Sequence, residues 1–386
     1  MKEALLSDDA RISIITNIIE AMVSHDRFLI VGHKNPDGDC IGAMVALGLI
    51  LSKFNKHPFI HLHNTPEEHF HYLLNFCRHH SICALDDFDT TRLQIEVVVA
   101  CDTPKLDMLD VTPAMNTIIN NRDVLVIEVD HHLGADAGYI GDEGYCLVDK
   151  ASSTCELVGE LALSLRDRKE LLQQHQLREL FTGNLVLAIL TGMITDTDMG
   201  KFLNTDRERR SFHFFSTMYG KIAARETEYA TLFSSLADLS AEIQQLSSAQ
   251  ERCFNKIMDY KKFSPAVGYV VVPESDMNAL YEHFSNETVV AASRAVANVL
   301  CEESGKFGLI AYYDNPEVSD LLQFRVRRSP YYKRFDLRAL LTSFAIKDGG
   351  GHEGAIAFRF PRGQINDVAE LVNNIITAIE DMIPGE

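Results

Sequence analysis

Short apolar runs alternate with helix-like stretches in the first half of the chain. Arg27–Gly32, Ile95–Ala100 and Val124–Val129 are rich in apolar and β-branched residues, and each ends abruptly in a polar stretch. Cys40–Phe54 repeats its apolar positions at helical spacing, and Leu185–Ile194 has the pattern of a buried helix. Strands that alternate with helices predict a parallel sheet covered by helices, in which ligands bind at the carboxyl ends of the strands.

The second half of the chain repeats this alternation on a smaller scale. Strand-like runs occur at Ala266–Val272, Phe307–Tyr313 and Leu321–Arg327, interleaved with helical stretches at Thr288–Cys301 and Asp367–Met382. These patterns predict a second, smaller α/β domain.

The stretch between the two halves is helical and polar, without a strand signal. We therefore expect an α/β protein with a parallel-sheet domain over residues 1–222, a helical connector over 223–262 and a smaller α/β domain over 263–386. The functional site is expected in the crevice between the two domains.

Composition places the chain among soluble, cytoplasmic proteins. No apolar run reaches the roughly 18 residues of a membrane span, and the N-terminus lacks the pattern of a secretory signal. The eight cysteines form no C-x-x-C pair, which favours buried thiols in a reducing compartment over disulfides or a zinc site.

The net charge of −19 argues against a broad basic face for long nucleic acid. A phosphate substrate would then be held by a local site, where bound metal ions can supply the positive charge. Small or short substrates are favoured.

Four polar clusters stand at the ends of predicted elements. Each alone has an ordinary explanation, such as Asp37 or Asp39 capping the helix that starts near Cys40. Four such coincidences are hard to assign to turns, and carboxylates with imidazoles suit Mn²⁺, Mg²⁺ or Fe²⁺ better than a thiolate zinc site. The candidate metal-binding clusters are His33 with Asp37 and Asp39, Asp102, Asp130 with His131 and His132, and Asp196.

This ordered set resembles the motifs of the DHH phosphoesterase family. The resemblance covers nearly the whole chain, including the G-G-G-H signature of the DHH-associated C-terminal domain, and so it is specific. The matching stretches are His33–Asp39 (H-x-N-P-D-x-D), Cys101–Thr103, Asp130–His132 (D-H-H), Ala151–Thr154, Gly192–Thr197 and Gly349–His352.

The resemblance implies two divalent metal ions, usually manganese in the family, that activate a water and neutralise the substrate phosphate. It implies that Asp130 orients a ligand histidine and that His132 faces the scissile phosphate, so these two are the expected catalytic residues. The implied ligands are His33, Asp37 and Asp102 for one ion, and Asp39, Asp102, His131 and Asp196 for the other.

The substrate would be held mainly by the second domain. A glycine run lets a ligand approach the backbone closely and offers it N–H groups. In the first domain, Ser152 and Ser153 are also expected to contact substrate. The expected contacts in the second domain are Arg325, Arg327, Arg328, Gly349, Gly350, Gly351 and His352.

The chain departs from the family pattern in the part that would recognise substrate. Asp348 stands where a fourth glycine is common, and Ala355–Ala357 replaces A-A-G. The segment 329–334 is longer than usual and contains Tyr331 and Tyr332, which could stack on a base, although an ordinary packed pair is favoured. These changes leave the preferred nucleotide open.

A second group of histidines competes as a metal site. It contains few carboxylates and matches no familiar ligand spacing, so a strand and a helix near the mouth of the site are favoured. Its members are His61, His63, His69, His71, His79 and His80, with Glu67 and Glu68 nearby.

The resemblance implies a phosphodiesterase that cleaves short oligoribonucleotides, or linear or cyclic dinucleotides such as pApA and cyclic di-AMP, to 5′-mononucleotides. Removal of the 3′-phosphate of adenosine 3′,5′-bisphosphate (pAp) is a common companion activity. The alternatives are a single-strand-specific 5′ exonuclease on longer strands and a non-catalytic nucleotide sensor; inorganic pyrophosphatase activity is disfavoured by the G-G-G-H run. We expect no membrane or long-duplex partner, and a homodimer is left open.

Overall fold

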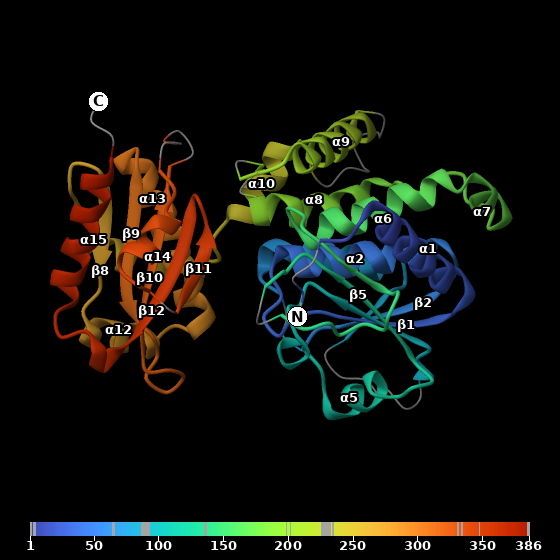
Figure 1. The fold of residues 1–386 in the computed structure, drawn as a ribbon, viewed down its shortest axis with the longest axis horizontal. Helices are drawn as coiled ribbons and strands as arrows, with labels where there is room; N and C mark the ends of the chain where they lie inside the picture. Colours follow the sequence, from blue (N-terminus) through green and yellow to red (C-terminus); the bar gives the residue numbers. More distant parts are fainter. Residues whose placement is uncertain are drawn as a thin grey trace. The chain divides into compact units, whose positions relative to one another are not determined.

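The chain divides into two compact units, Met1–Gln245 and Leu246–Glu386 (Figure 1). The boundary falls inside the range predicted as a connector, and the predicted domain limits and the crevice between the domains stay predictions. The structure, a computed structural model, describes residues 2, 5–63, 66–85, 93–134, 137–197, 199–200, 202–224, 233, 235–329, 332, 335–346 and 348–383.

The first unit is built on a six-stranded parallel sheet, which confirms the prediction. The strand order is β3-β2-β1-β4-β5-β6, so the direction in which strands are added reverses between β1 and β4. All neighbouring strands of this sheet pair in parallel. The strands are β1 (Arg27–Val31), β2 (His57–His61), β3 (Cys83–Leu85), β4 (Val97–Cys101), β5 (Leu125–Asp130) and β6 (Cys146–Val148).

Both faces of this sheet are covered, because alternate side chains of the central strands point to opposite sides. Phe28 and Val97 belong to the large core beneath α2, α6 and α8, whereas Leu29 and Val98 belong to a smaller core beneath α5 (Figure 1). The helices and turns are α1 (Asp8–Ser24), α2 (Gly38–Lys53), η1 (Glu68–Phe70), α3 (His71–His79), η2 (Leu106–Met108), α5 (Pro113–Ile119), α6 (Thr154–Asp167), α7 (Lys169–Gln174), α8 (Gly183–Thr197), α9 (Asp206–Ala223) and α10 (Leu236–Gln244).

Helix α8 differs from its prediction at the carboxyl end. Its apolar run stops at Ile194, but the helix continues to Thr197. The Thr195 hydroxyl donates to the Thr191 carbonyl oxygen at 3.1 Å, and Thr197 bonds in the same way to Met193, so both threonines remain within the helix. Asp196 therefore lies in the last turn of α8 and not in the loop after it.

The second unit carries a mixed six-stranded sheet in the order β11-β12-β10-β9-β8-β7, and its three predicted strands are confirmed. Only β8 and β9 pair in parallel among the described strand pairs. Helices α11 and α13 cover one face, and α14 and α15 cover the other. The elements are α11 (Ser248–Met258), β7 (Lys262–Phe263), β8 (Val267–Val271), α12 (Glu274–Tyr281), α13 (Asn286–Ser304), β9 (Phe307–Tyr313), β10 (Leu321–Arg328), α14 (Arg338–Ser343), β11 (Gly349–His352), β12 (Ala355–Pro361), η3 (Arg362–Gln364) and α15 (Val368–Met382).

Among the helices described in both units, none combines the length and the apolar character needed to cross a membrane.

Candidate metal centre

The candidate site lies at the carboxyl ends of the central strands of the parallel sheet. His33 follows β1, Asp102 follows β4, and Asp130 is the last residue of β5. Two helices contribute as well, because Asp39 lies in the first turn of α2 and Asp196 in the last turn of α8. Strands β1 and β4 flank the reversal in strand order, which is where parallel sheets bind ligands.

Asp102 stands between two imidazole rings. Its Oδ2 lies 3.6 Å from Nε2 of His33, and its Oδ1 lies 3.5 Å from Nε2 of His131. The residue is only 2% exposed. Ligand atoms about 2.1 Å from a shared ion lie about 3–4 Å from one another, so these separations leave room for an ion on each side of Asp102.

The other predicted ligands extend this pattern. Nε2 of His131 lies 3.4 Å from Oδ2 of Asp196 and 3.9 Å from Oδ2 of Asp39. Asp37 has its Oδ1 3.8 Å from Nε2 of His33 and also accepts hydrogen bonds from two backbone N–H groups of α2, so it caps the helix as well. The structure thus brings the six predicted ligands together; their roles as ligands stay predictions.

A cysteine that was not among the predicted ligands lies beside them. The donor atoms of Cys40, His33 and Asp102 all lie within 4.8 Å of one another. Burial raises the pKa of the Cys40 thiol to about 12, so it is protonated at neutral pH. Among the described residues, the other groups with donor atoms this close are Asp102 with His131 and His132, and Asp39 with His131 and Asp196.

The carboxylates of the site repel one another. Burial, followed by Coulomb repulsion from Asp102 and Asp37, raises the pKa of Asp39 well above its usual range. Burial, followed by repulsion from Asp39, Asp37 and Asp102, does the same for Asp196. A divalent cation would relieve this repulsion, and carboxylate and imidazole donors are those that Mn²⁺ and Mg²⁺ accept, so the residues fit a metal centre.

The start of helix α6 holds two of these carboxylates in place. The backbone N–H of Thr154 donates to Oδ2 of Asp39 at 2.6 Å, and that of Cys155 donates to Oδ1 at 2.8 Å. The Thr154 hydroxyl donates to Oδ1 of Asp102 at 2.9 Å. The partial positive charge of a helix N-terminus favours carboxylates there.

The two serines before this helix have partners within the protein. Ser153 caps α6 by accepting the backbone N–H of Glu156 at 3.1 Å. The Ser152 hydroxyl donates to Oε2 of Glu156 at 2.6 Å. Their predicted contacts with substrate stay predictions.

Gly192 of α8 leaves no room for a side chain beside Asp39. A Cβ at this position would lie 2.1 Å from Oδ1 of Asp39 and 2.4 Å from Sγ of Cys155. Because the backbone of α6 pins that carboxylate, we expect Gly192→Ala to destabilise the fold by about 1–3 kcal/mol and to weaken Mn²⁺ binding. Urea unfolding and calorimetric Mn²⁺ titration measure both effects. Gly220→Ala in α9 is the matched control, because a Cβ there would meet no described heavy atom within 4 Å; wild-type stability and Mn²⁺ affinity in Gly192→Ala would contradict the expectation.

Asp130 contacts His132, whereas it was expected to orient a ligand histidine. Its Oδ1 accepts Nδ1–H of His132 at 2.8 Å and the backbone N–H of the same residue at 3.2 Å. Although burial opposes both shifts, the contact lowers the pKa of Asp130 to about 2 and raises the pKa of His132. His132 therefore has one ring nitrogen occupied by Asp130 and the other free to face a substrate.

Two of the predicted substrate-binding arginines lie on the same face of β10. Arg325 and Arg327 are both half-buried. Nε of Arg325 donates to the Tyr312 hydroxyl at 3.3 Å, and Nε of Arg327 donates to Oδ1 of Asn298 at 3.2 Å. The partners in these two contacts are neutral side chains.

Arg328 lies on the opposite face of β10 and is 5% exposed. Its guanidinium donates to the carbonyl oxygen of Phe335 and, at 3.2 Å, to Oε1 of Glu353. These contacts tie β10 to the segment that follows it, and its predicted phosphate contact stays a prediction.

The predicted glycine run forms the edge strand β11, paired with β12 along one side. A Cβ would clash with β12 at Gly349 (2.5 Å) and at Gly351 (2.2 Å), and Gly351 also has a φ of +135°. At Gly350 a Cβ would meet no described heavy atom within 4 Å. Packing therefore explains the glycines at 349 and 351 but not Gly350. The side chain of His352 lies outside the described part of the structure.

The departures from the family pattern affect this unit. Tyr332 packs edge-on against Phe307, with ring centroids 5.4 Å apart, as an ordinary packed residue does. Tyr331 lies outside the described residues. Asp348 pairs with Arg359 at 2.7 Å.

Members of the second histidine group lie on a strand and on helices, as predicted. His61 ends β2, and His71 and His79 bound α3. Among the described residues, the groups whose donor atoms could hold a metal ion include none of these histidines.

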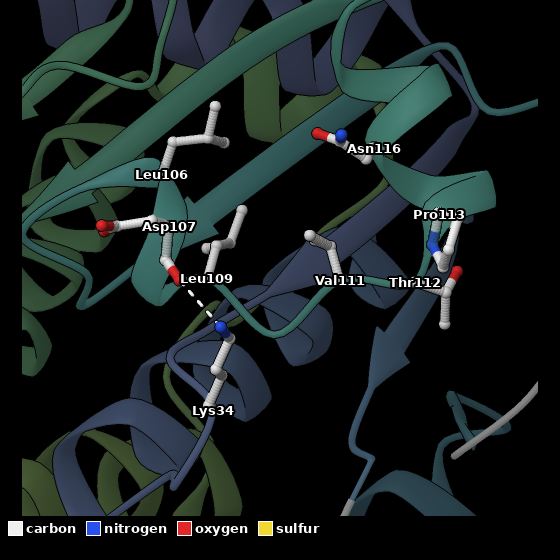
Figure 2. A pocket seen from close by; sticks show the side chains of 8 residues that line it. All are labelled: Lys34, Leu106, Asp107, Leu109, Val111, Thr112, Pro113 and Asn116. Atoms are coloured by element: carbon white, nitrogen blue, oxygen red, sulfur yellow. Dashed lines mark hydrogen bonds between the residues drawn. The ribbon is translucent and has the colours of Figure 1, made fainter.

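A surface pocket opens beside the loop that follows His33. Figure 2 shows Lys34 pointing toward Asp107, where its ammonium donates to the backbone carbonyl oxygen of Asp107 at 2.8 Å. This contact fixes η2 against the loop of the metal centre. The pocket is lined by Lys34, Leu106, Asp107, Leu109, Val111, Thr112, Pro113 and Asn116.

Part of the first unit matches a known protein family, and the fold of the chain resembles that of a solved structure. Residues 27–192 match the model of the DHH family, N-terminal domain. An exopolyphosphatase-related protein from Bacteroides fragilis has the same fold, with a TM-score of 0.62 and 18% identity over 95% of this chain and 96% of that chain. Comparison with curated proteins finds no match.

Two further solved structures align at lower similarity. A pGpG-specific phosphodiesterase from Vibrio cholerae has a TM-score of 0.37 and 12% identity, covering 92% of this chain and 99% of that chain. RecJ from Thermus thermophilus, in complex with Mn²⁺, has a TM-score of 0.40 and 14% identity, covering 99% of this chain and 56% of RecJ.

Proposed function

Residues 27–192 match the N-terminal domain of the DHH family, whose members are phosphoesterases, and on this premise we propose that the chain is a manganese-dependent phosphodiesterase acting on short nucleotides. The proposed substrates are short oligoribonucleotides and linear or cyclic dinucleotides such as pApA and cyclic di-AMP. The proposed products are 5′-mononucleotides, with removal of the 3′-phosphate of pAp as a companion activity.

The observation that carries this proposal is the position of Asp102 between His33 and His131. One carboxylate with an imidazole on each side is the arrangement that a shared ligand of two ions requires. When bound, two divalent ions supply an activated water and neutralise the charge on the substrate phosphate. The predicted ligands would hold them, and the repulsion that raises the pKa of Asp39 and Asp196 favours their binding.

His132 is the proposed contact to the reacting phosphate. Its Nδ1 is engaged by Asp130, and its side chain is 43% exposed. The ring is therefore fixed in orientation but accessible. With Nε2 directed to a substrate oxygen, it can donate a hydrogen bond or a proton there.

Strand β11 is the proposed contact to the nucleotide. Its glycines are exposed, and it lies at the edge of its sheet. At Gly350 no described neighbouring atom would clash with a side chain, so packing does not explain the glycine. An edge strand offers unpaired backbone N–H and C=O groups to a ligand. Arg325 and Arg327 can add positive charge, whereas the net charge of −19 provides no track for a long strand.

The test is turnover against RNA of two to twenty-four nucleotides, together with pAp, pApA and cyclic di-AMP, with Mn²⁺ or with chelator. We expect kcat/KM to peak at about two to five nucleotides, because each further phosphate lies outside the local site and is repelled. Chelator should abolish turnover and Mn²⁺ should restore it. A rise in kcat/KM out to twenty-four nucleotides would favour the 5′ exonuclease instead, and nucleotide binding without turnover would favour the sensor.

The same assay tests β11. We expect Gly350→Ala to raise KM for the preferred short substrate by about tenfold, about 1.4 kcal/mol, with kcat and fold unchanged. Gly363→Ala is the control, because a Cβ there also meets no described heavy atom within 4 Å and the residue lies in the same unit. Equal KM values in the two variants would remove β11 from the substrate site.

A further inference from the structure

Lys2 is a fully buried lysine directly behind the D-H-H motif. Its side chain is 0% exposed. The ammonium donates to Oδ2 of Asp130 at 2.7 Å and to the carbonyl oxygen of Thr103 at 3.0 Å, and it lies 2.6 Å from Oε1 of Glu128. Three oxygens thus surround a group that has three N–H donors.

Each of the two carboxylates uses its other oxygen elsewhere. Oδ1 of Asp130 accepts both N–H groups of His132, whereas Oε2 of Glu128 accepts the backbone N–H groups of Ile140 and Gly141 at 2.8 and 3.1 Å. Of these two carboxylates, Asp130 therefore connects Lys2 to His132. Glu128 connects Lys2 to the loop at Ile140 and Gly141.

The backbone around Lys2 is also anchored. Its N–H donates to the carbonyl oxygen of Ala137 at 3.2 Å, and its carbonyl oxygen accepts the N–H of Gly134 at 3.0 Å. Lys2 and Gly134 form an isolated antiparallel bridge. The lysine is therefore held against the segment that directly follows His132.

We propose that Lys2 is a positioning residue for His132, which acts by fixing the Asp130 carboxylate between its ammonium and the imidazole. The proposal rests on the proposed function of His132. Without the ammonium, Oδ2 of Asp130 loses the contact at 2.7 Å that holds the buried carboxylate in place, and the side chain is free to rotate. Rotation would weaken its hydrogen bond to Nδ1 of His132.

Four variants separate positioning from stability. Lys2→Met keeps the length of the side chain and removes the charge. Glu128→Gln is the matched control, because it removes the negative charge of one partner of the same buried group and leaves the contact between Lys2 and Asp130. The double variant Lys2→Met/Glu128→Gln lacks the ammonium but has one negative charge fewer, and His132→Ala supplies the reference spectrum.

We expect Lys2→Met to lower kcat by about 10–100-fold, with KM for the short substrate and metal content unchanged. Its Tm should fall, because two buried carboxylates lose their counter-charge. In the double variant Tm should partly recover, whereas kcat should stay low because Asp130 still lacks its partner. Glu128→Gln should keep kcat near that of wild type. If Lys2→Met does not fold, the double variant carries the comparison.

A readout without turnover separates this inference from the proposed function. In the Mg²⁺-loaded protein with ¹⁵N-labelled histidine, the Nδ1–H resonance of His132 is identified by its loss in His132→Ala. It should be unchanged in Glu128→Gln and shifted or lost in Lys2→Met and the double variant. If wild type cleaves no nucleotide, the proposed function fails and the spectrum still decides the role of Lys2. An unchanged resonance, or kcat that recovers together with Tm in the double variant, would overturn the inference.

Discussion

Asp102→Asn is expected to lower kcat by about 10³-fold or more, about 4 kcal/mol in barrier height, while leaving the fold intact. The reason is the position of this carboxylate, with Oδ1 facing His131 and Oδ2 facing His33. An amide is neutral, so it cannot serve both proposed ions as a bridging carboxylate does. Turnover at saturating Mn²⁺, bound metal by mass spectrometry and circular dichroism measure the three parts of the expectation.

Asparagine is chosen as the replacement because the backbone of Asp102 has a positive φ. Asp102 has a φ of 49°, in the left-handed region that asparagine and aspartate tolerate better than alanine does. Asp102→Ala would add backbone strain to the loss of the carboxylate and confuse the two.

We also expect Asp102→Asn to change Tm, which can be measured without any turnover. In metal-free protein, loss of one charge from a cluster that raises the pKa of Asp39 and Asp196 should raise Tm. Mn²⁺ should then raise Tm less in the variant than in wild type, because binding stabilises only the state that holds the ion. Asp107→Asn, at an exposed position in η2, is the control. Full turnover in Asp102→Asn would exclude the two-metal site.

His132→Ala is expected to lower kcat by about 10²–10⁴-fold with metal content retained. The ring is oriented by Asp130 at 2.8 Å and is 43% exposed, as a group that meets substrate should be. Its Nδ1 also lies 3.6 Å from Oδ1 of Asp102, so a ligand role is the competing interpretation. Metal analysis of the purified variant distinguishes the two.

His131→Ala is the matched comparison for His132→Ala. Nε2 of His131 faces three carboxylates, and this variant should lose bound metal as well as turnover. If His132→Ala loses the metal and His131→Ala keeps it, the roles of the two histidines have been exchanged.

The parallel sheet was predictable because its strands are locally recognisable. Each central strand is an apolar run with a polar site residue at its carboxyl end or just after it, and that is where the site forms. Asp196 shows the limit of this reading. A polar, β-branched stretch after an apolar run predicts the end of a helix, yet the hydroxyls of Thr195 and Thr197 bond back to carbonyls one turn earlier, and α8 continues through Asp196.

Long-range partners were beyond prediction from sequence. Lys2 meets Asp130 and Glu128 across more than a hundred residues, and nothing in its local pattern distinguishes it from an exposed lysine. The alternation along β10 places Arg327 and Arg328 on opposite faces of the strand. It does not predict that the Arg328 guanidinium donates to the carbonyl oxygen of Phe335, which lies on the segment after the strand. Such contacts depend on how separate segments pack, which periodicity does not report.

The reversal of strand order between β1 and β4 also bears on how the protein reaches its native state. The predicted ligands come from distant stretches of the chain, the first at His33 and the last at Asp196, so they meet only after the parallel sheet and α8 have packed together. Contacts of such long sequence separation form late and slow the folding of parallel sheets. Metal ions that bind a centre absent from the transition state stabilise the native state alone. Bound ions would therefore lower the rate of unfolding and would change the rate of folding little.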